Sequence, residues 1–159
     1  MKNAIFSAFV ALSVAATGST AAQAATAQAV QLVGSVKVDK LVTTAGVPKH
    51  VLLDPKTVVP GDHLVFSTGY INTSGKPVAN FVVTNPVPAG VAYAADGGTA
   101  LTVSCDGGKT WGALAALTVA TADGKRRAAQ PGDVTHIRWK LPLLAPGAAG
   151  SLTYNAIVR

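Results

Sequence analysis

Two segments near the C-terminus alternate apolar and polar residues, as half-buried β-strands do. In the segment 135–141 the apolar positions are Ile137, Trp139 and Leu141, and the polar positions are His136, Arg138 and Lys140. The segment 151–159 repeats the pattern, with Leu152, Tyr154, Ala156 and Val158 in the apolar row. Successive side chains of a strand point to opposite sides, so each segment predicts a strand with one buried face.

The remaining runs are rich in Val and Thr and show no helical periodicity, which also favours strands. We expect further strands at 31–42, 63–71, 78–84, 91–94 and in the pair 101–105 with 111–119. Gly and Pro turn signals separate these runs at short intervals. About seven such strands predict an all-β fold, an antiparallel sandwich of two packed sheets. The segment 43–60 carries three prolines, and we expect it to cross between the sheets along an edge.

Four turn motifs follow one another along this pattern. They are V-P-G-D at 59–62, Y-I-N-T-S-G at 70–75, A-N-F-V-V-T-N-P-V-P-A-G-V at 79–91 and L-A-P-G-A-A-G-S-L at 144–152. Pro60 presets a turn, Gly61 suits a positive φ, and Asp62 can cap the freed amides before a strand begins. Pro146 and Gly147 supply the turn before the last strand.

In this order the motifs resemble the bacterial surface-repeat family filed as domain of unknown function 11. The resemblance covers about residues 58–159 and implies an immunoglobulin-like antiparallel β-sandwich of about seven strands. Two features depart from the family pattern. Asn85 stands where the family usually has Asp, which we expect to remove a charge from a turn. Many members also carry tandem arrays, whereas this chain holds one copy.

The N-terminus has the three parts of a secretory signal. Lys2 supplies the positive charge, residues 4–16 form an apolar stretch, and Ala22-Gln23-Ala24 is a small-x-small cleavage motif. Ala27-Gln28-Ala29 is a second candidate cleavage site. The apolar stretch is shorter than the roughly 20 residues that span a bilayer. We therefore expect a cleavable signal peptide at residues 1–24, one domain at 25–159, and an exported product that is soluble in the periplasm or outside the cell.

The charge pattern does not favour a nucleic-acid partner. Thirteen basic and seven acidic side chains give a net charge of +6, and the acids are all Asp. The basic residues are dispersed except at Lys125-Arg126-Arg127, which follows Asp123-Gly124 and is typical of a solvated turn. Cys105 is the single cysteine, so no intrachain disulfide is available, and we expect its side chain to be a small buried hydrophobe.

Residues 104–111 match the "Asp box" S-x-D-x-G-x-T-W of sialidase-type propellers in every defined position. The motif is a hairpin: Asp106 accepts turn amides, the glycines at 107 and 108 allow left-handed backbone, and Trp111 packs across the returning strand. One copy cannot build a propeller, so we interpret it as structural. It also motivates the alternative that the protein binds or acts on carbohydrate.

Catalytic and metal-binding patterns are missing from the sequence. His50, His63, His136 and Cys105 show none of the close pairings of metal sites, and the loops at Asp96, Asp106 and Asp123 each hold one acid, too few for calcium. No nucleophile elbow or carboxylate pair indicates catalysis. We therefore predict neither catalytic residues nor a cofactor.

The sequence thus predicts a non-enzymatic structural or interaction module of the bacterial envelope or extracellular space. Its expected partner is a protein or a surface polysaccharide. The candidate contact surface is the polar row of the strand at 135–141, which carries His136, Arg138 and Lys140.

Overall fold

The computed structural model describes residues 29–44, 46–95 and 101–159, and this part of the chain forms β-strands and two short 3₁₀ helices. The strands are β1 (Val30–Thr44), β2 (Val47–Leu53), β3 (His63–Asn72), β4 (Val78–Pro86), β5 (Val91–Ala94), β6 (Leu101–Ser104), β7 (Thr118–Ala120), β8 (Arg126–Ala128), β9 (His136–Leu144) and β10 (Ala149–Val158). The 3₁₀ helices are η1 (Leu114–Ala116) and η2 (Pro131–Asp133). The predicted signal peptide with Ala22 and Ala24, and the Asp96 loop, lie outside the described residues.

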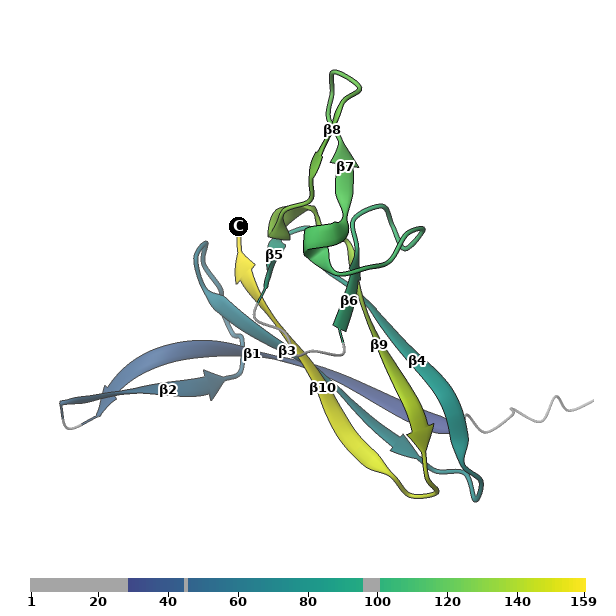
Figure 1. Ribbon diagram of the computed structural model, residues 1–159. Coiled ribbons are helices and arrows are strands. Elements are labelled where there is room, and N and C mark those ends of the chain that lie inside the picture. The colour runs from purple at the N-terminus through teal and green to yellow at the C-terminus, as the bar shows by residue number, and fades with distance from the viewer. Residues whose placement is uncertain (1–28, 45, 96–100) are drawn as a thin grey trace, which may run out of the picture.

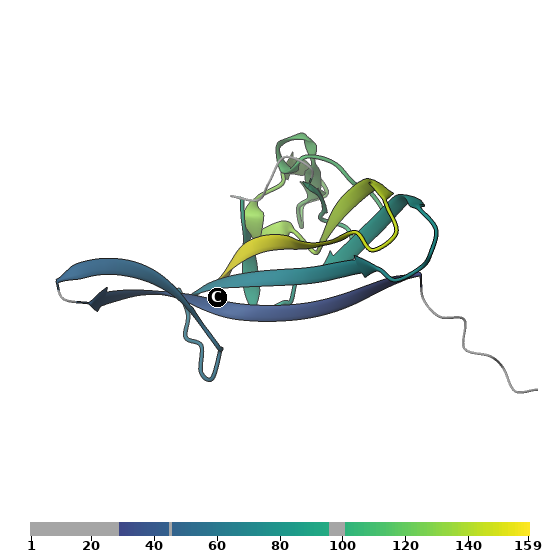
Figure 2. The same cartoon turned by 90° about the horizontal axis from the view of Figure 1, so that it is seen from below.

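The strands form antiparallel sheets, which confirms the all-β prediction. A five-stranded sheet has the order β2-β1-β3-β10-β5, and a three-stranded sheet has the order β4-β9-β6. The two sheets face each other as an open sandwich, and the β7–β8 ribbon projects from one end (Figures 1 and 2). The described residues hold ten strands instead of about seven. Within this part of the chain, no helix is long and apolar enough to span a membrane.

The core lies between the sheets and is built by the alternation seen in the sequence. Ile137 and Trp139 of β9 are buried against Tyr154 and Ala156 of β10, as their shared apolar rows predict. The ring of Phe66 on β3 stacks on that of Tyr154, with centroids 4.8 Å apart and an interplanar angle of 4°. The sandwich has no disulfide, and close packing of aromatic and β-branched side chains stabilises it instead.

Two predicted elements were wrong. The segment 43–60 does not cross between the sheets: residues 47–53 turn back along β1 as the edge strand β2, with Val47 opposite Thr44 and Leu53 opposite Val38. The strand expected at 111–119 is reduced to a single bridge between Val103 and Gly112, followed by η1 and the short strand β7. The 3₁₀ turn of η1 interrupts the extended backbone of this stretch, and Leu114 and Leu117 pack against the core from outside any strand.

Asn85 does not lie in a turn, as was expected, but in strand β4. Its side-chain amide donates a hydrogen bond to the hydroxyl of Thr68 on β3, with Nδ2 2.6 Å from Oγ1. The bond links the two sheets. The amide makes this bond without placing a charge between the sheets.

A second inter-sheet link is made by Asn72, which is fully buried at the end of β3. Its Nδ2 lies 2.9 Å from the carbonyl oxygen of Lys76, 3.0 Å from that of Leu144 and 3.1 Å from that of Ala145. Its Oδ1 accepts bonds from the backbone amide and the hydroxyl of Ser74. One side chain thus ties the β3–β4 turn to the end of β9.

Candidate functional site

The Asp-box loop is held by its own side chains. Asp106 Oδ1 accepts hydrogen bonds from the backbone amides of Lys109 at 3.0 Å and Thr110 at 2.9 Å, and Oδ2 accepts the Thr110 hydroxyl at 2.7 Å. Ser104 adds a bond from its hydroxyl to Oδ1 at 2.8 Å. These donors, first the amide and hydroxyl of Thr110 and then the Ser104 hydroxyl, hold the pKa of Asp106 well below its usual range. Its negative charge is therefore compensated by hydrogen-bond donors of the same loop.

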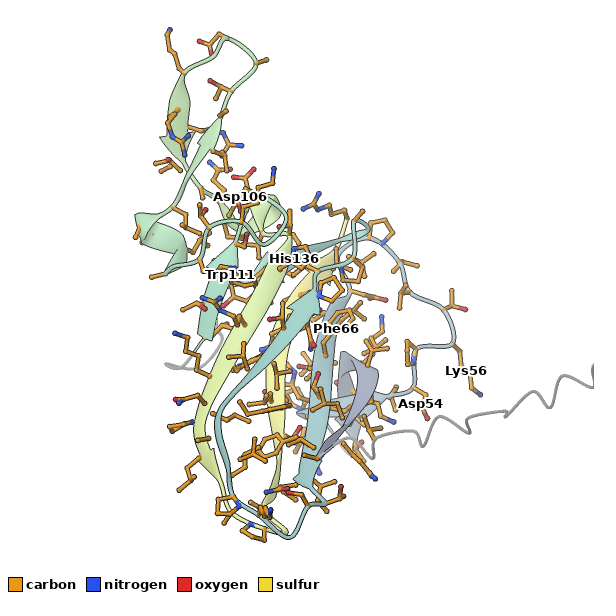
Figure 3. All side chains as sticks on the ribbon, turned by 90° about the vertical axis from the view of Figure 1, so that its right-hand side faces the viewer. Asp54, Lys56, Phe66, Asp106, Trp111 and His136 are labelled. Atoms are coloured by element: carbon orange, nitrogen blue, oxygen red, sulfur yellow. The ribbon has the colours of Figure 1, made fainter. Side chains whose placement is uncertain are left out.

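The backbone of this loop needs its glycines. Gly107 and Gly108 have φ of 74° and 89°, which side chains rarely tolerate, and the Gly108 carbonyl accepts a 2.8 Å bond from the indole nitrogen of Trp111. Figure 3 shows Asp106, Trp111 and His136 grouped together, apart from Asp54 and Lys56. The loop thus places the Trp111 ring beside the start of β9.

Strand β9 is the central strand of the three-stranded sheet and presents the predicted contact row on its outer face. Because Ile137 and Trp139 point into the core, His136, Arg138 and Lys140 point the other way. His136 and Arg138 are half-buried and Lys140 is exposed. The register places Thr84 and Thr102 on either side of Arg138, and Val82 beside Lys140. We call this outer surface, with Trp111, the contact face.

Arg138 contacts the Asp-box loop through Trp111. The centre of its guanidinium is 4.2 Å from the centroid of the Trp111 ring, a cation–π distance, and His136 meets the same ring edge-on at 6.4 Å. The Nε atom of Arg138 is buried and has no hydrogen-bond partner among the described residues. The indole therefore fixes the guanidinium in place without neutralising it. The same contact covers one face of the Trp111 ring, the surface on which a sugar would stack.

The charges of the described residues leave this face positive. The described carboxylates are occupied elsewhere: Asp39 by His50, Asp54 by Lys37, Asp62 by Lys40, Asp106 by its own loop, Asp123 by Lys125 and Asp133 by Arg127. Neither Arg138 nor Lys140 has an ion pair with any described residue. Two cations, one of them immobilised, thus face outward without a counter-ion from the described chain.

A shallow hollow continues the contact face along the same sheet. It measures about 510 Å³ and is lined by Asn80 and Val82 of β4 and by Lys140 and Pro142 of β9. Asn80 has a φ of 53°, the one positive value outside glycine in the described residues. Pro142 has no amide hydrogen and so donates no ladder bond to β4. The contact face therefore has a concave region as well as positive charge.

The predicted turn residues lie away from the contact face. Gly61 has a φ of 90°, and Asp62 accepts bonds from the backbone amide of Val59 and the ammonium of Lys40. The Lys40 ammonium, and then the Val59 amide, lower the pKa of Asp62. Pro146 and Gly147 form the turn between β9 and β10, where the Gly147 amide donates to the Asn72 carbonyl at 2.9 Å. These residues position strands.

The basic run and the cysteine are also engaged in structural contacts. Arg126 donates to the hydroxyl and carbonyl of Thr118, and Arg127 forms a two-point ion pair with Asp133 at 2.6 and 2.8 Å. Arg127 lowers the pKa of Asp133 to about 2. Cys105 is half-buried, and burial raises the pKa of its thiol. No group of three or more His, Cys, Asp or Glu in the described ranges is arranged to hold a metal ion.

The pairing of Arg138 with Trp111 is the part of the site that the sequence did not reveal. The two residues are 138 minus 111, or 27, positions apart, and neither motif refers to the other. No protein-family model matches the chain, and neither the curated proteins nor the solved structures contain a significant match to it.

Proposed function

We propose that this chain is an exported, non-enzymatic interaction module of the bacterial envelope or extracellular space that binds an acidic protein or surface partner through the contact face. The observation that carries the proposal is the positive charge of Arg138 and Lys140 beside Trp111, which no carboxylate of the described residues pairs. A guanidinium that an aromatic ring already holds in place loses little side-chain entropy when it meets a carboxylate.

The same proposal assigns the fold to the immunoglobulin-like class that the turn motifs resemble. Two facing antiparallel sheets support it, as does the position of each motif at a junction between strands. Residues 59–62 lead into β3, and residues 70–75 lead from β3 into the turn before β4. Residues 79–91 run from β4 to β5, and residues 144–152 join β9 to β10.

The test compares two carboxylate-rich probes, a polyaspartate peptide and polygalacturonate, by titration calorimetry at low and high salt. The variant Arg138→Asp/Lys140→Asp should lose binding at least tenfold, because both attractive charges become repulsive. The matched control Lys56→Asp/Lys76→Asp makes the same change of −4 in net charge on exposed loops, and it should bind like the wild type.

Equal losses in both variants would show that only net charge matters and would refute the contact face. Binding of polygalacturonate without binding of the peptide would favour the carbohydrate alternative that the Asp box suggests. No binding of either probe by the wild type would overturn the proposal of an acidic partner.

A further inference from the structure

A two-stranded arm projects from the body of the protein on the side opposite the β3–β4 turn. Strand β1 pairs with β3 only as far as Asp39, and beyond that residue its sole neighbour is β2. We call residues 40–44 and 46–53 the arm; Figures 1 and 2 show it extending beyond both sheets. An isolated two-stranded ribbon is marginally stable in water, so an arm of this length calls for a covering surface.

The arm exposes apolar side chains on both of its faces. Leu41 is 64% exposed and Val47 66%, and Val42, Leu52 and Leu53 are also largely exposed. By the register, Val42, Val47 and Leu53 share the face that continues the buried row of Val38. Apolar patches of this kind on a protein surface mark interaction sites.

The body has an apolar groove of matching character. It measures about 460 Å³ and lies where the smaller sheet leaves β1 uncovered beside the edge of β4. Its lining includes Leu32, Gly34 and Val36 of β1 together with Phe66 and Tyr154, and none of its residues carries a charge. Leu32 is 43% exposed there although it lies on the inner face of the sheet.

The geometry points to a second copy of this chain as the occupant: the arm of each copy packs on the groove of the other. Both surfaces belong to the same face of the same strand, because positions 32, 34 and 36 share the parity of positions 38 and 42. A two-fold axis between the copies can lay each arm, with Val42 and Thr44, over the partner's groove, with Gly34 and Leu32, while Val38 stays covered by its own core. One two-fold axis thus produces both arm–groove contacts.

The charges agree with this arrangement. The groove carries none, and on the arm face concerned Lys40 is already paired with Asp62. Lys49 lies on the free edge strand β2, where its ammonium can extend into water while its stem covers apolar surface. No buried charge is left without a partner in such a dimer.

The buried area places this dimer among small interfaces. A ribbon two strands wide and about seven residues long covers roughly 10 by 24 Å, or about 240 Å². Two arms and the two surfaces that they cover bury about 1,000 Å², the lower limit for a specific interface. We therefore expect a reversible dimer with a dissociation constant in the micromolar range.

Sedimentation velocity of the full mature chain, from about 1 to 200 µM, tests this inference. Val47→Asp on the arm and Leu32→Asp in the groove should each weaken the dimer at least tenfold, and both positions are exposed enough to spare the fold. An equimolar mixture of the two variants keeps one intact arm and one intact groove, and it should associate better than either variant alone.

Cross-linking places the contact. In a Cys105→Ala background, copies with Val42→Cys are mixed with copies with Gly34→Cys and treated with a short bismaleimide. A Cβ added at Gly34 meets no atom within 4 Å, so that position accepts the change. Only the mixture should yield a cross-linked dimer, and Val33→Cys, on the opposite face of β1, should not replace Gly34→Cys.

A wild-type monomer at 200 µM would overturn the inference. So would a dimer that Leu32→Asp leaves unchanged, since that result would assign the contact to arm–arm pairing. Binding of the monomer to phosphatidylcholine vesicles through the arm would assign it to a lipid surface instead.

Discussion

Replacing Asn72 tests the inter-sheet link most directly. The side chain is fully buried, and its Nδ2 faces three carbonyl oxygens within 3.1 Å. An amide nitrogen has two hydrogens, so the three acceptors share two full bonds. Asn72→Ala removes both of them, together with the two bonds that Oδ1 accepts from the amide and hydroxyl of Ser74.

The expected loss follows from these bonds. Two donated hydrogen bonds at about 1 kcal/mol each, and about 0.5 kcal/mol for each of the two part-buried bonds from Ser74, give a loss of about 3 kcal/mol in the free energy of unfolding. For a chain of this length the midpoint of thermal unfolding should fall by about 10 °C. The main-chain bonds of residue 72 to Gly147 and Ala148 remain, so the fold itself should persist.

Asn72→Asp adds a pH dependence that Asn72→Ala lacks. A carboxylate at this position faces three carbonyl oxygens and cannot donate, so burial and repulsion raise the pKa of the introduced carboxyl above its unfolded value of about 3.9. The folded state then binds more protons than the unfolded state. The stability of this variant should therefore fall as pH rises from about 4 to the folded-state pKa and stay low above it.

Urea and thermal unfolding of both variants at pH 4 and pH 7 measure these effects, with Gln31→Ala on the neighbouring exposed surface as the control. A loss below 1 kcal/mol in Asn72→Ala would show that the turn rearranges without cost. An Asn72→Asp variant as stable at pH 7 as at pH 4 would refute the burial argument.

Three further predictions concern other parts of the fold. Ile137→Ala should cost about 2–5 kcal/mol in chemical unfolding, because the residue is 0% exposed, whereas Val33→Ala, at a position 70% exposed, should stay within about 0.5 kcal/mol. Asp106 should remain ionised at pH 3 in a carboxyl carbon NMR titration, and its contribution to stability should be lost only as pH falls from about 4 through its lowered pKa; a normal titration midpoint near 3.9 would contradict the bonding of the Asp-box loop. Burial raises the pKa of Tyr154 to about 12, so ultraviolet titration should show one tyrosine that ionises near that pH and disappears in Tyr154→Phe, and stability should fall as pH rises above 10.

The strands that could be predicted are those in which apolar and polar residues alternate because one face of the strand is buried. Strands β9 and β10 each bury one row of side chains, so the sequence shows their faces and their limits to within three residues. Strand β2 buries almost nothing, and no burial pattern marks it in the sequence. The prolines of the segment 43–60 therefore led to the expectation of a crossing between the sheets. Prolines are also compatible with an edge strand.

The same distinction applies to the contact face. The bonds that Asp106 and Trp111 make join residues within the eight-residue Asp box, so a local motif can predict them, whereas the bonds of Gly107 and Ser104 to Thr135 cannot be predicted in this way. The stacking of Arg138 on Trp111 depends on the packing of β9 beside that loop, and no spacing rule describes it. The groove beside β4 arises from the unequal widths of two sheets, which is a property of strand order.

Strand β10 follows every other strand in chain order but lies inside the five-stranded sheet, between β3 and β5. Strand β5 has no other ladder partner among the described residues, and the Gly61 amide donates to the Val158 carbonyl. A chain that emerges N-terminus first can form its early hairpins but cannot complete this sheet until residues 149–158 arrive. Completion of this sheet therefore waits until residues 149–158 are available, and interruption before that point would leave the apolar face of β3 open to aggregation.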